Sequence, residues 1–187
     1  MGKIEIKDLT VEYVEKKNKF KALDNVTFTV EDGEFVSIIG ASGCGKSTLL
    51  SILEGVHFPT SGTASIDGKP ITGTGTDRGV VFQHYSLFPW MTARDNVAFG
   101  IKQARKELSK SERLAIADEF LDKVGLASFA EKYPNQLSGG MQQRVAIARA
   151  LAMDTEILLM DEPFGAIDAK NRVTLQKLLM RLWEGYG

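Results

Sequence analysis

At 187 residues the chain is long enough for one domain around one hydrophobic core. Its 23 basic and 24 acidic side chains nearly cancel, so bulk charge gives no reason to expect a nucleic-acid partner. A single cysteine excludes a disulfide within the chain, as is typical of a reducing cytoplasm. We find no secretory-signal pattern and no apolar run of membrane-spanning length, so we expect any membrane association to go through a partner.

Strand patterns fill most of the first 83 residues. Alternating apolar residues predict strands, and short apolar runs predict buried ones. A helix is expected after the glycine-rich stretch at residues 40–48, ending by residues 59–62. The predicted strands cover residues 4–14, 26–30, 35–39, 63–66 and 79–82, the last of which ends at Gln83.

From about residue 90 the pattern becomes helical. Ser109 and Glu112 have the spacing of a capping box, and Gly125 suits the end of the helix that follows. Another helix is expected from residue 137, a strand at residues 157–160 and a last helix from about Asp168. We therefore predict an α-helical subdomain at residues 89–140, inserted into an α/β core formed by residues 1–88 and 141–187.

Residues 40–48 (Gly-Ala-Ser-Gly-Cys-Gly-Lys-Ser-Thr) fit the pattern G-x-x-x-x-G-K-[ST] between a predicted strand and a predicted helix. Glycines let successive backbone N–H groups curl around an anion, and the helix N-terminus adds its own unpaired N–H groups. Lys46 would neutralise the β- and γ-phosphates, and the Ser47 hydroxyl would hold Mg²⁺. The sequence thus predicts that a nucleoside triphosphate binds here. The expected binding residues are Gly40, Ser42, Gly43, Cys44, Gly45, Lys46, Ser47 and Thr48.

Two carboxylates, Asp161 and Glu162, follow the apolar run at residues 157–160. A buried strand that ends in this pair places it at the carboxyl edge of the sheet, where α/β proteins bind ligands. Asp161 would hold Mg²⁺, and Glu162 would act as the general base on the attacking water. Without the phosphate loop the same pair could equally be structural.

Residues 137–144 (Leu-Ser-Gly-Gly-Met-Gln-Gln-Arg) resemble the signature motif of ABC ATPases. The resemblance covers essentially the whole chain. It implies ATP and Mg²⁺ as ligands, and a dimer with a second copy or a related ATPase subunit across the ATP. The resemblance implies that Gln83 is the catalytic and Mg²⁺-binding glutamine of the Q-loop and that Tyr13 stacks on adenine. It also implies that Asp168 belongs to the D-loop at residues 166–168. The nucleotide of the partner subunit would be bound by Ser138, Gly139 and Gly140. The alternative for Ser138 is an ordinary helix N-cap.

A finer resemblance lies in residues 78–83, 87–90 and 96–100, which look like the nitrate, taurine and sulfonate branch of bacterial importer ATPases. It implies that residues 83–100 receive a helix of a membrane permease at the cytoplasmic face of the membrane, with a periplasmic or lipid-anchored solute-binding protein as an indirect partner. The alternative is that Leu87, Phe88 and Trp90 are core of the helical subdomain. A soluble, non-transport ABC ATPase is an alternative function, against which residues 83–100 argue. A P-loop kinase or GTPase would not explain residues 137–140.

The chain departs from this family near its end. The family carries a switch histidine on a strand beyond the last predicted helix, and neither His57 nor His84 lies where it could substitute. We therefore expect an α/β P-loop NTPase core with a parallel sheet, an N-terminal antiparallel β part and an inserted helical subdomain, incomplete at the C-terminus. A nucleotide-binding fragment without turnover remains an alternative function.

Overall fold

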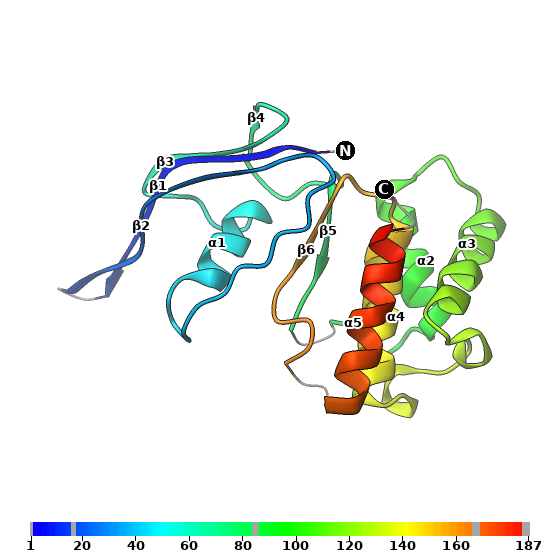
Figure 1. The fold of residues 1–187 in the computed structure, drawn as a ribbon. Coiled ribbons are helices and arrows are strands. Elements are labelled where there is room, and N and C mark those ends of the chain that lie inside the picture. Colours follow the sequence, from blue (N-terminus) through cyan, green and yellow to red (C-terminus); the bar gives the residue numbers. More distant parts are fainter. Residues whose placement is uncertain (1, 16–17, 84–85, 166–168, 185–187) are drawn as a thin grey trace. The chain divides into compact units, whose positions relative to one another are not determined.

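The computed structural model describes residues 2–15, 18–83, 86–165 and 169–184 (Figure 1). The chain forms two compact units, Met1–Arg78 and Gly79–Gly187. Among the described residues, no helix has both the length and the hydropathy needed to cross a bilayer. Residues 166–168, which contain Asp168, and His84 lie outside the described residues.

The first unit contains a four-stranded sheet and one helix. Its elements are β1 (Ile4–Glu15), β2 (Asn18–Val30), α1 (Lys46–Leu53), β3 (Ser61–Ile66) and β4 (Lys69–Pro70). The strand order is β2-β1-β3-β4, and the neighbouring strands pair antiparallel. This sheet is the N-terminal antiparallel part that the sequence predicts, with residues 4–14 in one strand.

A β-bulge near Asp8 explains which residues of β1 are buried. The register of β1 with both neighbours shifts after this point, and Asp8 has a positive φ of 52°. A β-bulge adds one residue to a strand and so changes which residues face the core. Ile4 and Ile6 are buried before the bulge, whereas Leu9 and Val11 are buried after it. One bulged strand therefore accounts for the alternating apolar residues both before and after Asp8.

Helix α1 is held by its buried face and by a buried arginine at its C-terminal end. Leu49, Ile52 and Leu53 are buried along it. At its C-terminus the buried guanidinium of Arg78 donates to the Leu53 carbonyl at 2.7 Å and to the Gly73 carbonyl at 3.2 Å. A cation at this end satisfies carbonyls that lack a helical partner. The helix ends at Leu53, before the end predicted from the sequence at residues 59–62.

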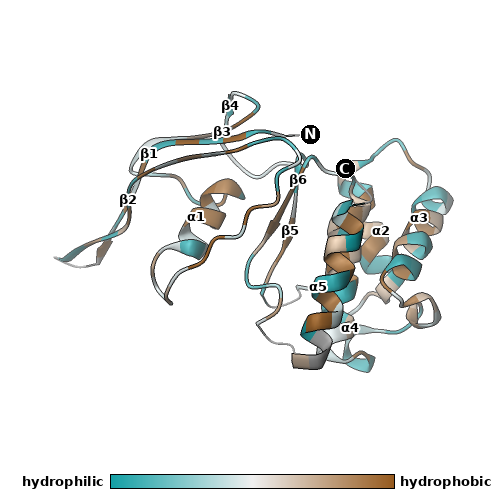
Figure 2. Cartoon of the chain, in the orientation of Figure 1, coloured by the Kyte–Doolittle hydropathy of each residue, from teal (hydrophilic) through white to brown (hydrophobic). Residues whose placement is uncertain are grey.

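The predicted buried strand at residues 35–39 is wrong for this structure. These residues form no strand, no ladder of the described sheets includes them, and Ile39 is 89% exposed. Figure 2 nevertheless shows a hydrophobic stretch within the run between β2 and α1. A strand needs neighbours for its N–H and C=O groups. Because the described residues supply no such neighbour, this run has no regular secondary structure despite its apolar sequence.

The second unit combines a two-stranded sheet with a helical lobe. Its elements are β5 (Arg78–Val81), α2 (Ala93–Ala104), α3 (Lys110–Lys123), two short 3₁₀ helices (Ala127–Phe129 and Pro134–Gln136), α4 (Gly139–Ala152), β6 (Ile157–Met160) and α5 (Ala169–Glu184). The amide of Asp161, just after β6, donates to the carbonyl of Val81 at the end of β5, at 3.0 Å. The carboxyl ends of these strands therefore lie side by side, as in a parallel pair.

Two hydrophobic clusters stabilise this unit, one on each side of α4. Val97, Ile101, Leu121 and Val145 belong to the cluster among α2, α3 and α4. The second cluster packs α4 against β5 and α5. The predicted capping box is confirmed at the start of α3, where Ser109 and Glu112 bond reciprocally. The division into a core and a subdomain at residues 89–140 stays a prediction.

Candidate nucleotide-binding site

The phosphate loop leads into α1 with a backbone that only glycine adopts easily. Gly43 and Gly45 have φ values of 80° and 101°. A Cβ on Gly45 would lie 2.5 Å from the Ala22 carbonyl oxygen, closer than any real contact. Gly45 is also the N-cap of α1, and no side chain caps that end. The loop thus presents a helix N-terminus that suits an anion.

Lys46 folds back over its own loop. Its Nζ donates to the carbonyls of Gly40 and Ala41, each at 2.9 Å, and lies 3.9 Å from the Cys44 sulfur. A Cβ on Gly40 would lie 2.6 Å from that sulfur, so the thiol packs inside the loop's curve while remaining exposed to solvent. The ammonium and the thiol therefore share one local environment.

Tyr13 lies near the end of β1 with 40% of its surface exposed. It pairs in register with Phe20 of β2, which is also exposed, and its ring meets the His57 ring edge-on at 6.3 Å between centroids. An exposed ring on a strand can stack on a base. No sequence motif indicates Phe20 or His57 here, because strand register and the fold, not spacing, bring them to Tyr13.

In the second unit, Gln83 and Glu162 meet at the carboxyl ends of β5 and β6. The Gln83 amide nitrogen donates to Glu162 Oε2 at 2.9 Å. Glu162 has a positive φ of 41°, which strains a residue with a side chain, and its carbonyl accepts from the Gly165 amide. Strained residues of this kind concentrate at functional sites.

These side chains offer oxygen atoms to a hard cation. Because the amide nitrogen of Gln83 is the atom that bonds Glu162, its amide oxygen can serve a cation. Asp161 adds a carboxylate immediately after β6. Carboxylate, amide and hydroxyl oxygens are the ligands that Mg²⁺ accepts. The oxygen donors of Gln83 and Asp161 in the second unit, and that of Ser47 in the first, are each of a kind that Mg²⁺ accepts.

Ser138 begins α4 as its N-cap. Its side chain accepts a hydrogen bond from the Met141 amide at 3.4 Å, while the hydroxyl stays exposed. Gly139 and Gly140 form the first turn and are partly exposed. The N-cap alternative therefore describes what Ser138 does locally. An exposed N-terminus with two glycines is also compatible with an approaching phosphate.

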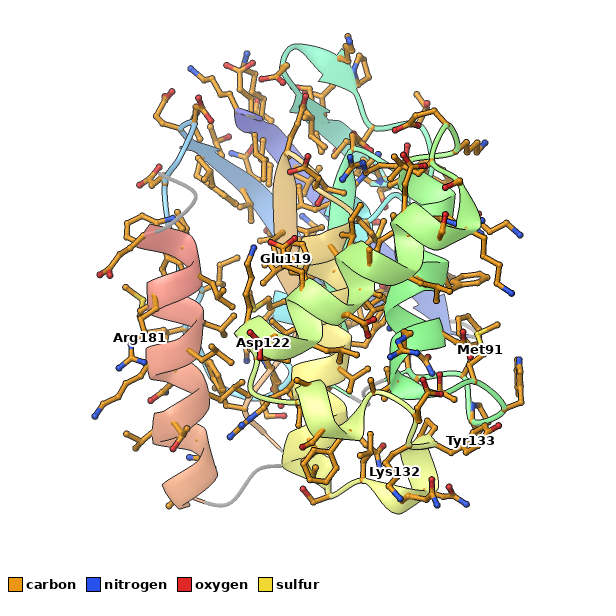
Figure 3. All side chains as sticks on the ribbon, turned by 90° about the vertical axis from the view of Figure 1, so that its right-hand side faces the viewer. Met91, Glu119, Asp122, Lys132, Tyr133 and Arg181 are labelled. Atoms are coloured by element: carbon orange, nitrogen blue, oxygen red, sulfur yellow. The ribbon has the colours of Figure 1, made fainter. Side chains whose placement is uncertain are left out.

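The aromatic stretch after Gln83 divides between core and surface. Leu87 packs against the helical cluster, whereas Trp90 is 70% exposed. The Phe88 ring contacts the rings of Trp90 and Phe99, with centroids 5.5 Å and 4.7 Å apart. The Ala93 amide donates to the Lys132 carbonyl at 2.8 Å, and Figure 3 shows Met91, Lys132 and Tyr133 at one edge of the helical lobe.

Asn96 holds this aromatic segment in place, a role that the sequence motifs do not indicate. It is fully buried on α2. Its side chain accepts from the Phe88 amide at 2.8 Å and donates to the carbonyls of Phe88, Met91 and Thr92. An asparagine inside a helix, where its propensity is poor, is the one signal that could have indicated this role.

Arg149 of α4 supports the loop that follows Gln83. Its guanidinium donates to the Ser86 carbonyl at 2.8 Å. Burial lowers the pKa of Arg149 from its usual value. The side chain nevertheless stays protonated, because arginine titrates far above neutral pH.

A nucleotide-binding loop, a Gln–Glu pair after two strands and a helix that starts with Ser-Gly-Gly together define an ATP-binding cassette. The ABC transporter family model matches residues 23–165. The chain therefore belongs to the ABC transporter family of ATP-binding domains and is an ABC-type ATPase domain.

Curated relatives agree with this membership. The nitrate import ATP-binding protein NrtD of Synechocystis sp. is 52% identical over 97% of this chain and 67% of its own length. An uncharacterized ABC transporter ATP-binding protein, MJ0412 of Methanocaldococcus jannaschii, is 51% identical over the same shares. The bicarbonate transport ATP-binding protein CmpC of Synechococcus elongatus is 50% identical over 94% of this chain and 28% of its own length. The chain thus spans two thirds of the first two relatives and less of the third.

Solved structures show the same fold. The dimeric ATP-binding cassette MJ0796, in a post-hydrolysis state bound to ADP and Pi, superposes with a TM-score of 0.88 at 40% identity. The match covers 98% of this chain and 84% of that one. The predicted ABC ATPase-like α/β fold is therefore confirmed.

Proposed function

We propose that this chain is the ATP-binding and ATP-hydrolysing part of an ABC importer for a small anion, nitrate or bicarbonate. The observation that carries the proposal is the phosphate loop, in which Gly45 has a φ that favours glycine and leaves no room for a Cβ. The names of the relatives support the choice of anion. The wider prediction of taurine or another sulfonate stays a prediction.

In this proposal the first unit binds the nucleotide. Lys46 and the amides of residues 43–48 hold the phosphates, and Tyr13 stacks on adenine. The contacts of Lys46 with the Gly40 and Ala41 carbonyls support this role, because they hold the ammonium at the loop rather than in solvent. Gly40, Ser42, Cys44 and Thr48 shape the same loop.

The second unit supplies the base. Glu162 takes a proton from the attacking water, and Gln83 holds the Glu162 carboxylate through Oε2, which leaves Oε1 for the water. Ser47, Gln83 and Asp161 would hold Mg²⁺. When bound, Mg²⁺ would neutralise charge on the phosphates. Catalysis would otherwise rest on positioning and charge stabilisation.

The partners follow from the same reading. A second copy, or a related ATPase subunit, would complete the site with residues 138–140 and Asp168. The exposed ring of Trp90, fixed through Phe88 and Asn96, supports a permease contact within residues 83–100. We expect the domain to lie at the cytoplasmic face of the membrane, with a solute-binding protein as an indirect partner.

A second candidate is nucleotide binding without turnover. The exposure of residues 35–39 favours it, because this run joins no described sheet. A phosphate loop that follows an unpaired coil instead of a strand would position the γ-phosphate less precisely for attack by water. The two candidates differ in phosphate release and not in binding.

The test uses two variants and a control. Lys46→Ala should lose stabilisation by Mg-ATP in a melting assay, where a ligand at about a hundred times its Kd contributes about 2.7 kcal/mol. Lys69→Ala, another lysine of the first unit, should keep it. Glu162→Gln should keep binding and lose phosphate release. Full stabilisation of Lys46→Ala would refute nucleotide binding at this loop, and no release by the parent chain would favour the second candidate.

A further inference from the structure

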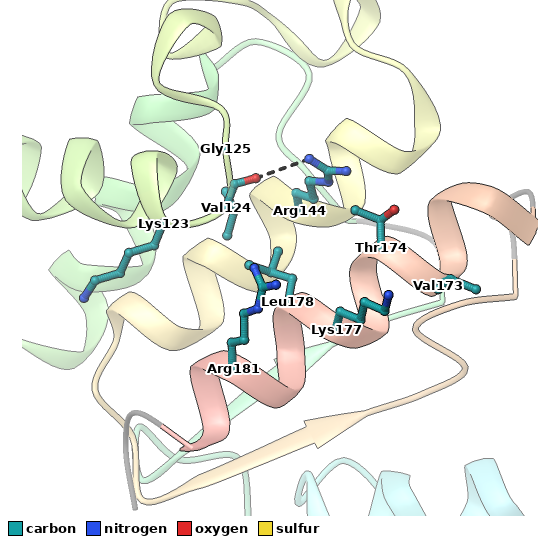
Figure 4. Close-up of a pocket in the computed structure, with 9 residues that line it drawn as sticks. All are labelled: Lys123, Val124, Gly125, Arg144, Val173, Thr174, Lys177, Leu178 and Arg181. Atoms are coloured by element: carbon teal, nitrogen blue, oxygen red, sulfur yellow. Dashed lines mark hydrogen bonds between the residues drawn. The ribbon is translucent and has the colours of Figure 1, made fainter.

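A cleft of about 290 Å³ lies within the second unit, away from the Gln83–Glu162 pair, where the end of α3 meets α4 and α5 (Figure 4). Four basic side chains line it: Lys123, Arg144, Lys177 and Arg181. No carboxylate is among the lining residues. We propose that this cleft binds a small polyanion, a molecule with two or more carboxylate or phosphate groups.

The two cations from α5 carry most of the argument. Lys177 and Arg181 are exposed, one helical turn apart, and both line the cleft. Neither forms a hydrogen bond or ion pair with another residue that the structure describes. Two like charges at this spacing repel each other slightly, so a bound anion would relieve the repulsion. Arginine and lysine side chains commonly bind carboxylate and phosphate groups through charge-assisted hydrogen bonds.

Structural roles account for the other two cations. Arg144 Nη1 donates to the carbonyl of Val124 at 3.4 Å and so caps the end of α3, where Gly125 turns the chain with φ 72°. Lys123 forms an ion pair with Glu119 at 2.8 Å and lies over the Phe120 ring. Helix capping therefore explains Arg144, and the contacts with Glu119 and Phe120 explain Lys123. Neither kind of contact explains Lys177 and Arg181.

The nearby acids leave the cleft positive. Figure 3 shows Glu119 and Asp122 on α3 and Arg181 on α5. Glu119 is engaged by Lys123, and neither acid lines the cleft. Even with both acids and Glu184, three residues after Arg181 on α5, counted, four cations against three anions leave an excess of positive charge. Potentials of this kind concentrate anions at a surface.

The remaining lining limits the size and shape of the ligand. Val124, Val173 and Leu178 provide apolar surface, and the Thr174 side chain adds a hydroxyl (Figure 4). The volume is at the lower end for small-molecule sites, which run from about 300 Å³ upward. A compact metabolite with two separated anionic groups fits these features better than a macromolecule does.

The experiment measures binding of citrate and of pyrophosphate to the 187-residue chain by isothermal titration calorimetry. Citrate represents the carboxylate form and pyrophosphate the phosphate form. The Lys46→Ala background removes the phosphate-loop lysine, so a result at the cleft does not depend on the proposed function. We expect saturable binding of at least one probe. Amide shifts in an NMR titration should centre on Gly125 and Thr174.

Charge reversal distinguishes the cleft from general attraction. The double variant Lys177→Glu/Arg181→Glu should weaken binding at least about tenfold, because charge-assisted hydrogen bonds become repulsions. Lys110→Ala, an exposed lysine of α3 outside the cleft, should leave the affinity unchanged. Circular dichroism would confirm that the double variant folds. Absence of saturable binding, equal affinity of the double variant, or NMR shifts centred elsewhere would overturn the proposal.

Discussion

Replacing Gly45 by alanine tests whether the phosphate loop has the geometry that the structure shows. Gly45 has φ 101°, and its Cβ would lie 2.5 Å from the Ala22 oxygen and 2.7 Å from Leu23 Cδ2. Gly43 is a matched control, because its φ of 80° is also positive but a Cβ there would meet nothing within 4 Å. The pair separates backbone strain from steric contact.

The two effects have different expected sizes. A positive φ costs a residue with a side chain roughly 1–2 kcal/mol, so Gly43→Ala should lose about that much stability. Gly45→Ala adds an overpacked contact with a backbone atom, for which overpacking typically costs about 1–3 kcal/mol more. We therefore expect a total loss of about 2–5 kcal/mol for Gly45→Ala, on the order of half of a typical domain's stability.

Urea denaturation followed by circular dichroism measures both losses. The midpoint should fall further for Gly45→Ala than for Gly43→Ala, and stabilisation by Mg-ATP should be lost in Gly45→Ala. Because the chain has two compact units, unfolding should be checked for a single transition before free energies are compared. Equal midpoints for the two variants would show that Gly45 does not approach Ala22, and would refute the reasoning.

Three further predictions follow from single residues. The exposed thiol of Cys44 should react with maleimide and be protected by Mg-ATP, and equal labelling with and without nucleotide would contradict the loop geometry. The hydrogen bonds from Ser109 lower the pKa of Glu112 from its ordinary 4.5. Their contribution to stability should therefore be complete above pH 4.5 and be lost as the pH falls through the pKa of Glu112 in the folded state. The stabilities of the parent and of Glu112→Gln, measured by urea denaturation, should converge in acid. Asn96→Ala should destabilise by about 2–4 kcal/mol, because the Phe88 amide and several carbonyls lose a buried partner, and a loss below about 1 kcal/mol in urea denaturation would show that these bonds are not maintained.

Local sequence determined the features that depend on neighbours along the chain. Ser109 and Glu112 form the predicted capping box, and Gly125 turns the chain after α3, because these contacts span three or four residues. The phosphate loop was predictable for the same reason, since Gly45 and Lys46 act within one turn of the backbone. Such features need little from the rest of the fold.

Only the tertiary structure decided the features that depend on distant partners. Residues 35–39 are as apolar as a buried strand, but strand formation needs a neighbouring ladder, which the described residues do not supply. The bond between Gln83 and Glu162 joins residues 79 positions apart, and no local pattern predicts it. The exposure of Trp90 and the burial of Asn96 likewise depend on how α2 packs. Sequence patterns indicate which residues can do chemistry, whereas packing between distant segments decides which of them meet.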